Sequence, residues 1–263
     1  MTSSAKIVLA GVGKSFKAAG GGEIVAVSDA SITIGAGEFV TIVGPSGCGK
    51  STLLYIIGGF VSRSSGTITM DGRPIEGPGV ERGIVFQEYA LFPWLTVEQN
   101  ILYPLRRRNL PKNEQKAEAA RLIEVIGLRG FERRFPRELS GGMRQRVAIA
   151  RTLAADPDVL LLDEPFGALD AQTREIMQDE LLRVWRATSK TVCLITHDVT
   201  EAIYLSQRVL IMSARPGRII DEVRISLDRD LPREECETSA AFAEQRNAVW
   251  LKVRREALAA ATR

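Results

Sequence analysis

The stretch that decides the fold is Gly44-Pro45-Ser46-Gly47-Cys48-Gly49-Lys50-Ser51-Thr52. It follows an apolar run at 39–43 and opens a segment of helical composition at 50–57. This order of strand, loop and helix fits the pattern G-x-x-x-x-G-K-[ST] in its required context. Its glycines allow successive backbone N–H groups to converge on phosphate oxygens at a helix start. We therefore expect a nucleotide site in which Lys50 reaches the β and γ phosphates and the Ser51 hydroxyl binds Mg²⁺.

Two acidic residues follow a second apolar run. Residues 159–162 read Val-Leu-Leu-Leu, as in a strand that is buried on both faces, and Asp163 and Glu164 come next. Ligands of parallel sheets bind at the carboxyl ends of strands. Asp163 is therefore expected to hold the metal through its water shell, and Glu164 to polarise the water that attacks the γ-phosphate. Read alone, the pair could also end a strand at a solvated edge.

Strands and helices alternate on either side of a helical region at about 97–155. That region is rich in Arg, Glu, Ala and Leu, and is broken near 111, 127–130 and 136. The pattern predicts an α/β fold with a parallel core, an N-terminal β-rich portion and an inserted helical subdomain. Apart from the two runs above, the expected elements are strands at 7–13, 32–34, 66–72, 83–87 and 191–196, and an amphipathic helix at 173–186.

Composition excludes several classes of protein. The chain has 263 residues, of which 45% are apolar and 25% charged, and a net charge of +3, which gives no electrostatic footprint for nucleic acid. The apolar run at 53–61 is shorter than the about 20 residues that cross a membrane, so we expect a soluble chain. The three cysteines, at 48, 193 and 236, form no CxxC pair, which favours a reducing compartment.

Two further features stay ambiguous on sequence alone. Ser140 is a good helix N-cap, whereas Gly141 and Gly142 are poor helix formers, as if bare N–H groups had to approach an anion. A helix cap without a ligand remains the alternative. His197 is the single histidine and follows the apolar run 192–196. A lone histidine in such a place is usually structural or on the surface.

Together these motifs resemble the ATP-binding subunit of ABC transporters, and the resemblance extends to about Asp221. It implies a P-loop NTPase (RecA-like) parallel core with an N-terminal antiparallel β subdomain and an inserted α-helical subdomain. The motifs appear in family order, as the phosphate loop from Gly44, Gln87, LSGGMRQRV from Leu139, LLLDEP ending at Pro165, GALD at 167–170, and His197.

The resemblance also implies a head-to-tail homodimer, or a pseudo-symmetric heterodimer. Each ATP would lie between residues 44–52 of one chain and the signature residues Ser140, Gly141, Gly142 and Gln145 of the other, across an isologous interface. Asp170 would organise that interface.

The remaining site residues are likewise assigned by the resemblance. Gln87 would contact Mg²⁺ and the attacking water, and His197 would hydrogen-bond the γ-phosphate and place the water with Glu164. Phe16 is placed like the adenine-stacking aromatic, although an aromatic there is equally consistent with a core residue. Cys48 lies inside the phosphate loop and suggests thiol sensitivity.

Partners are implied as well. Residues 88–100, which are rich in aromatics, would meet a permease near Gln87 to Asn100, unless Phe92 and Trp94 belong to the helical core. The subunit would sit peripherally at the cytoplasmic face of the inner membrane, with an extracytoplasmic solute-binding protein in the full system and no nucleic acid. The segments LFPWLTVEQN and DEPFGALDAQTRE are most similar to importers of nitrate, sulfonate, taurine and bicarbonate.

The expected domains are an ATPase domain at 1–221 and a C-terminal extension at 222–263. The extension would be helical and docked on the core, with Val249, Trp250, Val253 and Ala257 on one side. The alternative function is a non-transport ABC ATPase in DNA repair or translation. A small-molecule P-loop kinase is opposed by the signature segment and by Glu164.

Overall fold

The computed structural model describes residues 4–18, 20–188 and 190–261. The chain forms two compact units, Met1–Gly79 with Thr191–Arg263, and Val80–Lys190. The first unit is called the core unit here and the second the inserted unit. Each is described by itself.

The core unit contains an antiparallel sheet in the order β2-β1-β4-β5. Alternate residues of β1, such as Ile7 and Leu9, are buried, as expected for a sheet with one face on the core. Asp71 and Gly72 both have positive φ and join β4 to β5, which is the backbone of a tight hairpin turn. The expected N-terminal antiparallel portion is confirmed. Its strands are β1 Ala5–Lys17, β2 Glu23–Gly35, β4 Ser65–Met70 and β5 Arg73–Pro74.

A second sheet of the core unit places the phosphate loop. Strand β3 (Phe39–Val43) is buried along its whole length and pairs in parallel with β8 (Thr191–Ile195) and β9 (Arg208–Met212). Its carboxyl end therefore delivers residues 44–52 between the ends of two neighbouring strands, where parallel sheets bind ligands. Helices α1 (Lys50–Gly58) and α6 (Val199–Leu205) contact this sheet.

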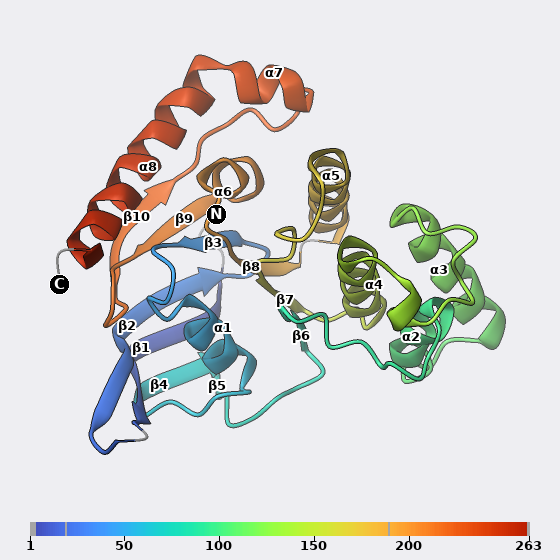
Figure 1. Cartoon of the computed structure of the whole chain (residues 1–263), viewed down its shortest axis with the longest axis horizontal. Helices are drawn as coiled ribbons and strands as arrows, with labels where there is room; N and C mark the ends of the chain where they lie inside the picture. The colour runs from blue at the N-terminus through green and yellow to red at the C-terminus, as the bar shows by residue number, and fades with distance from the viewer. Residues whose placement is uncertain (1–3, 19, 189, 262–263) are drawn as a thin grey trace. The chain divides into compact units, whose positions relative to one another are not determined.

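Two elements at the C-terminal end of the core unit complete it. Strand β10 (Ile219–Arg224) pairs antiparallel with β9, so the parallel sheet carries one antiparallel edge strand. The expected boundary after residue 221 lies inside β10. Helices α7 (Arg233–Thr238) and α8 (Ala240–Ala261) follow, and α8 runs beside α6 and β9 (Figure 1).

The packed face of α8 differs in part from the expected one. Phe242 and Val249 are buried in a cluster with Val199, and Val253 packs against it. Trp250 is 46% exposed, so its assignment to the apolar side was wrong. The reason is that Trp250 follows Val249 by one residue and points about 100° away around the helix.

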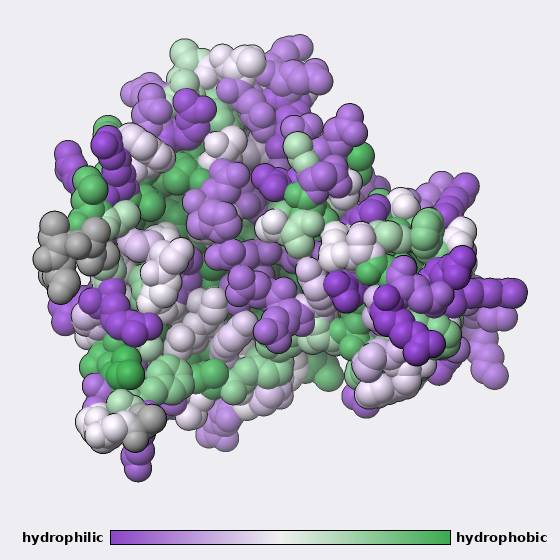
Figure 2. Space-filling view, viewed as in Figure 1, coloured by the Kyte–Doolittle hydropathy of each residue, from purple (hydrophilic) through white to green (hydrophobic). Residues whose placement is uncertain are grey.

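The described residues of the inserted unit form a strand pair and four α-helices. Strands β6 (Arg82–Val85) and β7 (Val159–Asp163) are parallel, with Val85 opposite Leu162. The predicted breaks are confirmed, since Pro111 precedes helix α3 (Lys112–Val125) and Gly127 follows it with a φ of 63°. Hydrophilic residues cover much of the visible surface over the helices (Figure 2). The helices are α2 Val97–Leu105, α3 Lys112–Val125, α4 Gly141–Ala154 and α5 Ala171–Thr188.

None of the described helices combines the length and the apolar character that crossing a bilayer requires.

Candidate nucleotide-binding site

The phosphate loop needs glycine at two places for steric reasons. A Cβ on Gly44 would lie 2.6 Å from the carbonyl oxygen of Met212. Gly49 has a φ of 107°, and a Cβ there would lie 2.5 Å from the carbonyl oxygen of Ala26. Both positions therefore require the absence of a side chain, which is what allows the loop to curl tightly at the start of α1.

Lys50 lies across the loop. Its side chain is 6% exposed, and its Nζ donates hydrogen bonds of 2.9 Å to the carbonyl oxygens of both Gly44 and Pro45. Ser51 and Thr52 follow in the first turn of α1, half-buried, and Ser46 and Gly47 are exposed at the loop tip. The ammonium group is thus held on the inside of the curl, among the backbone groups that are expected to face phosphate.

Cys48 is buried behind the loop. Burial raises the pKa of its thiol, although the nearby Lys50 ammonium favours the thiolate. The Sγ lies 3.9 Å from Lys50 Nζ. A raised pKa and a buried sulfur predict a slow thiol, so the expected thiol sensitivity finds no support in this geometry.

His197 occupies a short turn between β8 and α6. Thr196 Oγ1 donates to Glu201 Oε2 at 2.7 Å and accepts from the backbone N–H of Asp198 at 3.0 Å. Asp198 caps α6 by accepting from the N–H groups of Thr200 and Glu201. These bonds fix the backbone on either side of His197. His197 itself is exposed. The turn therefore holds an imidazole at the carboxyl end of β8, the strand next to β3.

Phe16 lies on β1 opposite Ile24. It is 42% exposed, and Lys14 Nζ lies 5.0 Å from the centroid of its ring. A core role is therefore excluded, while adenine stacking stays a prediction.

In the inserted unit, the carboxyl ends of β6 and β7 bring the acidic pair and Gln87 to one edge. Asp163 is fully buried and Glu164 half-buried. Because Val85 is opposite Leu162, Gln87 and Glu164 both lie two residues beyond the last pair of the ladder. Gln87 is exposed there. Glu164 has a φ of 47°, a backbone conformation that a non-glycine residue adopts at a cost and that often marks a functional site.

Sequence reasoning missed what supports Glu164. The Gln145 side chain is 2% exposed, and its Nε2 donates to the carbonyl oxygen of Glu164 at 3.3 Å. The backbone N–H of Gly167 donates to the same oxygen, also at 3.3 Å. Gln145 thus connects α4 to the strained turn. No sequence signal marks this contact, because the two residues meet only through the fold.

The signature segment begins α4 as expected. Ser140 is the N-cap and its Oγ accepts from the Met143 N–H at 3.3 Å. A Cβ on Gly142 would lie 3.2 Å from the carbonyl oxygen of Ala168, so close packing is a reason for this glycine besides anion binding. Asp170 Oδ1 accepts from the Thr173 N–H at 3.0 Å, and this hydrogen bond lowers the pKa of the carboxyl.

The segment after Gln87 presents aromatic side chains. The ring of Phe92 lies 5.7 Å from that of Trp94 and 4.6 Å from that of Tyr103, centroid to centroid. Arg151 lies over Phe92 at 5.2 Å. Trp94 is 69% exposed, which excludes a core role for it, whereas Phe92 is half-buried.

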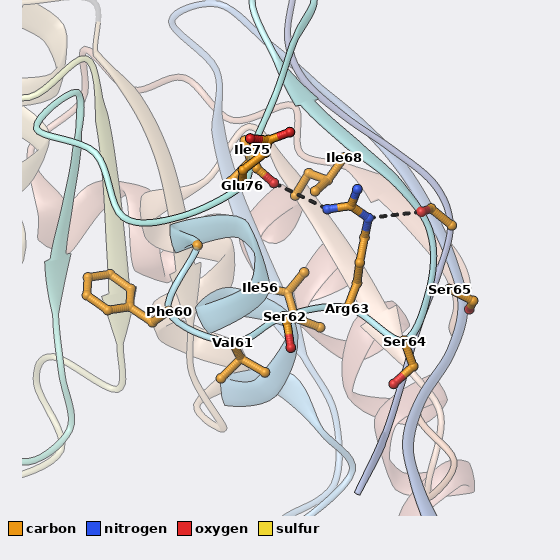
Figure 3. Close-up of a pocket in the computed structure, with 12 residues that line it drawn as sticks. Ile56, Phe60, Val61, Ser62, Arg63, Ser64, Ser65, Ile68, Ile75 and Glu76 are labelled. Carbon is orange, nitrogen blue, oxygen red and sulfur yellow. Dashed lines mark hydrogen bonds between the residues drawn. The ribbon is translucent and has the colours of Figure 1, made fainter.

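A separate cavity of about 520 Å³ lies at the far end of α1, in the core unit (Figure 3). Arg63 stands in its wall and donates to the carbonyl oxygens of Gly66 and Ile75 at 2.9 and 3.2 Å. None of the sequence-predicted site residues lines it. The Arg63 bonds tie the β4–β5 hairpin to the segment that follows α1, which is a structural role.

Each unit offers an oxygen group of the kind that Mg²⁺ binds. Ser51 offers a hydroxyl beside Lys50, and Asp163 offers a carboxylate that is buried at the end of β7. Mg²⁺ prefers hard oxygen ligands and is commonly held through one or two side chains together with substrate phosphates. Ser51 in the core unit and Asp163 in the inserted unit are therefore each of a type that fits this metal.

Comparison with known proteins decides the family. A family model described as ABC transporter matches residues 27–167. The chain belongs to the ABC transporter family. A dimeric ATP-binding cassette, solved with ADP and phosphate, superposes on this ABC protein with a TM-score of 0.76 and 33% identity, over 84% of this chain and 99% of that one.

Two relatives are similar to this ABC protein over most of their length. The aliphatic sulfonates import ATP-binding protein of Bacillus licheniformis is 50% identical over 82% of each chain. The nitrate import ATP-binding protein of Synechocystis is 50% identical over 80% of this chain and 79% of its own. The expected fold and class are therefore confirmed, and the protein is an ATP-binding, ATP-hydrolysing member of the family.

Proposed function

We propose that this chain is the ATPase subunit of an importer for nitrate, a sulfonate, taurine or a similar small anion. The similarity to sulfonate and nitrate import ATP-binding proteins, at 50% identity over about four fifths of the chain, carries this proposal. The ATPase domain, expected at 1–221, runs to the end of strand β10 at Arg224, and the residues after it form an extension that docks on it.

ATP binds between two copies of the chain in head-to-tail order. Residues 44–52 of one copy hold the phosphates, Lys50 neutralises charge on the β and γ groups, and Phe16 stacks on adenine. Ser140, Gly141 and Gly142 of the other copy close the site, and Asp170 organises the interface. Gln145, which is 2% exposed, acts instead on Glu164 of its own chain. The bare N–H groups at the start of α4, on the glycines after the Ser140 cap, support this arrangement.

Hydrolysis depends on placing one water molecule. Glu164 accepts its proton, while His197 and Gln87 hold the γ-phosphate and the water in line, so that positioning and charge stabilisation supply most of the rate. The strained backbone of Glu164, with its carbonyl bonded to Gln145, supports a carboxylate held in one orientation. Ser51, Asp163 and Gln87 would hold Mg²⁺, which would neutralise charge on the β and γ phosphates when bound.

The chain lies at the cytoplasmic face of the inner membrane. There the permease contacts its segment from Gln87 to Asn100. The exposed Trp94 beside Phe92 and Tyr103 supports this assignment, because exposed aromatic clusters mark partner surfaces. An extracytoplasmic solute-binding protein delivers the anion.

The test is co-purification followed by a transport-coupled assay. The chain should be recovered with a hydrophobic membrane protein, and the reconstituted complex should hydrolyse ATP faster when a solute-binding protein is loaded with nitrate, a sulfonate or taurine. A sugar and a cationic amino acid serve as control solutes. Recovery with nucleic acid or ribosomes in place of a membrane protein would instead favour the non-transport ABC ATPase.

A further inference from the structure

The phosphate loop rests on a second loop of the core unit, residues 213–218, which joins β9 to β10. Arg215 Nη2 donates a hydrogen bond of 3.2 Å to the carbonyl oxygen of Gly47. A Cβ on Gly217 would overlap both the carbonyl oxygen of Cys48 and the Cε of Met212, so no side chain fits at this contact between the two loops. Two consecutive carbonyls of the phosphate loop thus face this second loop.

The supporting loop is itself fixed to β2. The backbone N–H of Gly217 donates to the Ala26 carbonyl oxygen at 3.0 Å, and its own carbonyl accepts from the Ser28 N–H at 2.9 Å. Ser213 Oγ accepts from the Arg218 N–H at 3.0 Å. The Ala26 carbonyl also lies against Gly49. The phosphate loop and the supporting loop therefore both pack against the same backbone group of β2.

Helix α8 reaches the supporting loop from the C-terminal extension. Glu256 Oε2 accepts a hydrogen bond of 3.2 Å from the Ala214 N–H, next to Arg215. Lys252, one turn earlier, pairs with Asp221 at 2.6 Å. Val249 packs in the buried cluster that contains Val199, which follows His197 by two residues. Helix α8 therefore contacts both the loop 213–218, which supports the phosphate loop, and the buried cluster next to His197.

We infer that Gly217 and Glu256 are positioning residues for the phosphate loop, and that the C-terminal helix sets the ATP affinity of the protein through them. This inference rests on the proposed site residues. Its physical reason is that a phosphate site binds through backbone N–H groups that are already oriented, so any freedom given to the loop must be removed again on binding. Loosening the support therefore weakens ATP binding more than it slows the chemical step.

The first experiment substitutes Gly217→Ala. The added methyl group must displace the Cys48 carbonyl, so we expect the KM for ATP and the dissociation constant for ADP to rise roughly tenfold, with a much smaller change in kcat. Gly77→Ala is the matched control, because a Cβ there meets no atom within 4 Å. It should leave the KM, the dissociation constant and kcat unchanged.

The second experiment does not depend on how the protein tolerates a methyl group in a tight place. Glu256→Ala removes the acceptor for Ala214 and should raise the KM for ATP roughly threefold. Glu256→Gln keeps an acceptor oxygen and should restore the wild-type KM. Glu244→Ala removes an exposed carboxylate from the same helix and should have no effect. Thermal unfolding without nucleotide is measured for every variant.

The outcomes separate the positioning role from a general loss of stability and from the proposed function. A KM that rises in Glu256→Ala and recovers in Glu256→Gln supports the inference. Unchanged KM and ADP affinity in both Gly217→Ala and Glu256→Ala, whatever the melting temperature, would overturn it while leaving the ATPase function intact. A wild-type chain that binds no ATP would overturn both.

Discussion

Glu164 combines a proposed catalytic role with a strained backbone conformation. Its φ of 47° costs energy for a residue with a side chain, and its carbonyl oxygen is held by Gln145 and by the N–H of Gly167. Glu164 lies between a fully buried Asp163 and the buried Pro165. These contacts fix the backbone from which the Glu164 side chain projects.

Gln145→Met tests that support. The substitution keeps the length of the side chain but removes the donor to Glu164, so we expect kcat to fall roughly tenfold while the KM for ATP is retained. Steady-state kinetics over a range of ATP concentrations gives both constants. A raised KM with an unchanged kcat would mean that Gln145 contacts the nucleotide, as the family resemblance implied, and that its bond to Glu164 is incidental.

Cys48 provides a residue-scale test of burial. Because desolvation raises the pKa of its thiol, the neutral form persists to higher pH than in a free cysteine, whose pKa is about 8.5. Alkylation by N-ethylmaleimide should therefore be slow at neutral pH and should still accelerate above that value. The measurement uses mass spectrometry on a variant with Cys193→Ala and Cys236→Ala. Rapid alkylation at neutral pH would show a stabilised thiolate instead.

At the scale of elements, the first turn of helix α4 has two structural features, a side-chain cap and a close backbone contact. Ser140 caps it, whereas Gly142 lets the backbone at Ala168 approach and leaves N–H groups bare. The sequence alone identified the cap and the weak helix formers, but it could not show the approach of Ala168, which is distant along the chain. The same limit applies to Gln145 and Glu164.

Ser140→Trp tests whether this turn acts on a second copy of the chain. We expect hydrolysis to be lost because the indole fills the space for the facing nucleotide, whereas the ATP affinity of the isolated monomer is retained. Thr96→Ala is the control, since it removes the cap of α2 in the same unit at a similar stability cost of about 1 kcal/mol. An equal collapse of monomer affinity would place the signature in the same chain's site.

Local pattern predicted most elements, but strands β5, β9 and β10 and helices α6 and α7 were not among the expected elements. The buried strands β3, β7 and β8 and the helices of the inserted unit were predictable from apolar runs, glycines and prolines. Strand β10 was not, because its residues alternate between half-buried and exposed and the strand is defined by pairing with β9. Trp250 was misplaced for a related reason, since the apolar face of α8 is set by the cluster around Val199.

At the scale of the whole molecule, the residues proposed to act on the nucleotide come from both units. The core unit carries the phosphate loop and His197, and the inserted unit carries the acidic pair, Gln87 and the signature turn. No described helix is suited to crossing a bilayer, and the aromatic cluster around Trp94 offers a surface for a partner. We therefore propose that the chain works as one half of a nucleotide-bridged pair.

The central claim is therefore that two copies close on ATP and that Glu164 then activates the water. Size-exclusion chromatography of Glu164→Gln with ATP and Mg²⁺ tests it most directly. We expect a stable dimer that contains unhydrolysed ATP, and a return to monomer when Lys50→Ala is added to the same variant. A Glu164→Gln chain that binds ATP but elutes only as a monomer, or that hydrolyses ATP at the wild-type rate, would show that two copies do not close on ATP in this way.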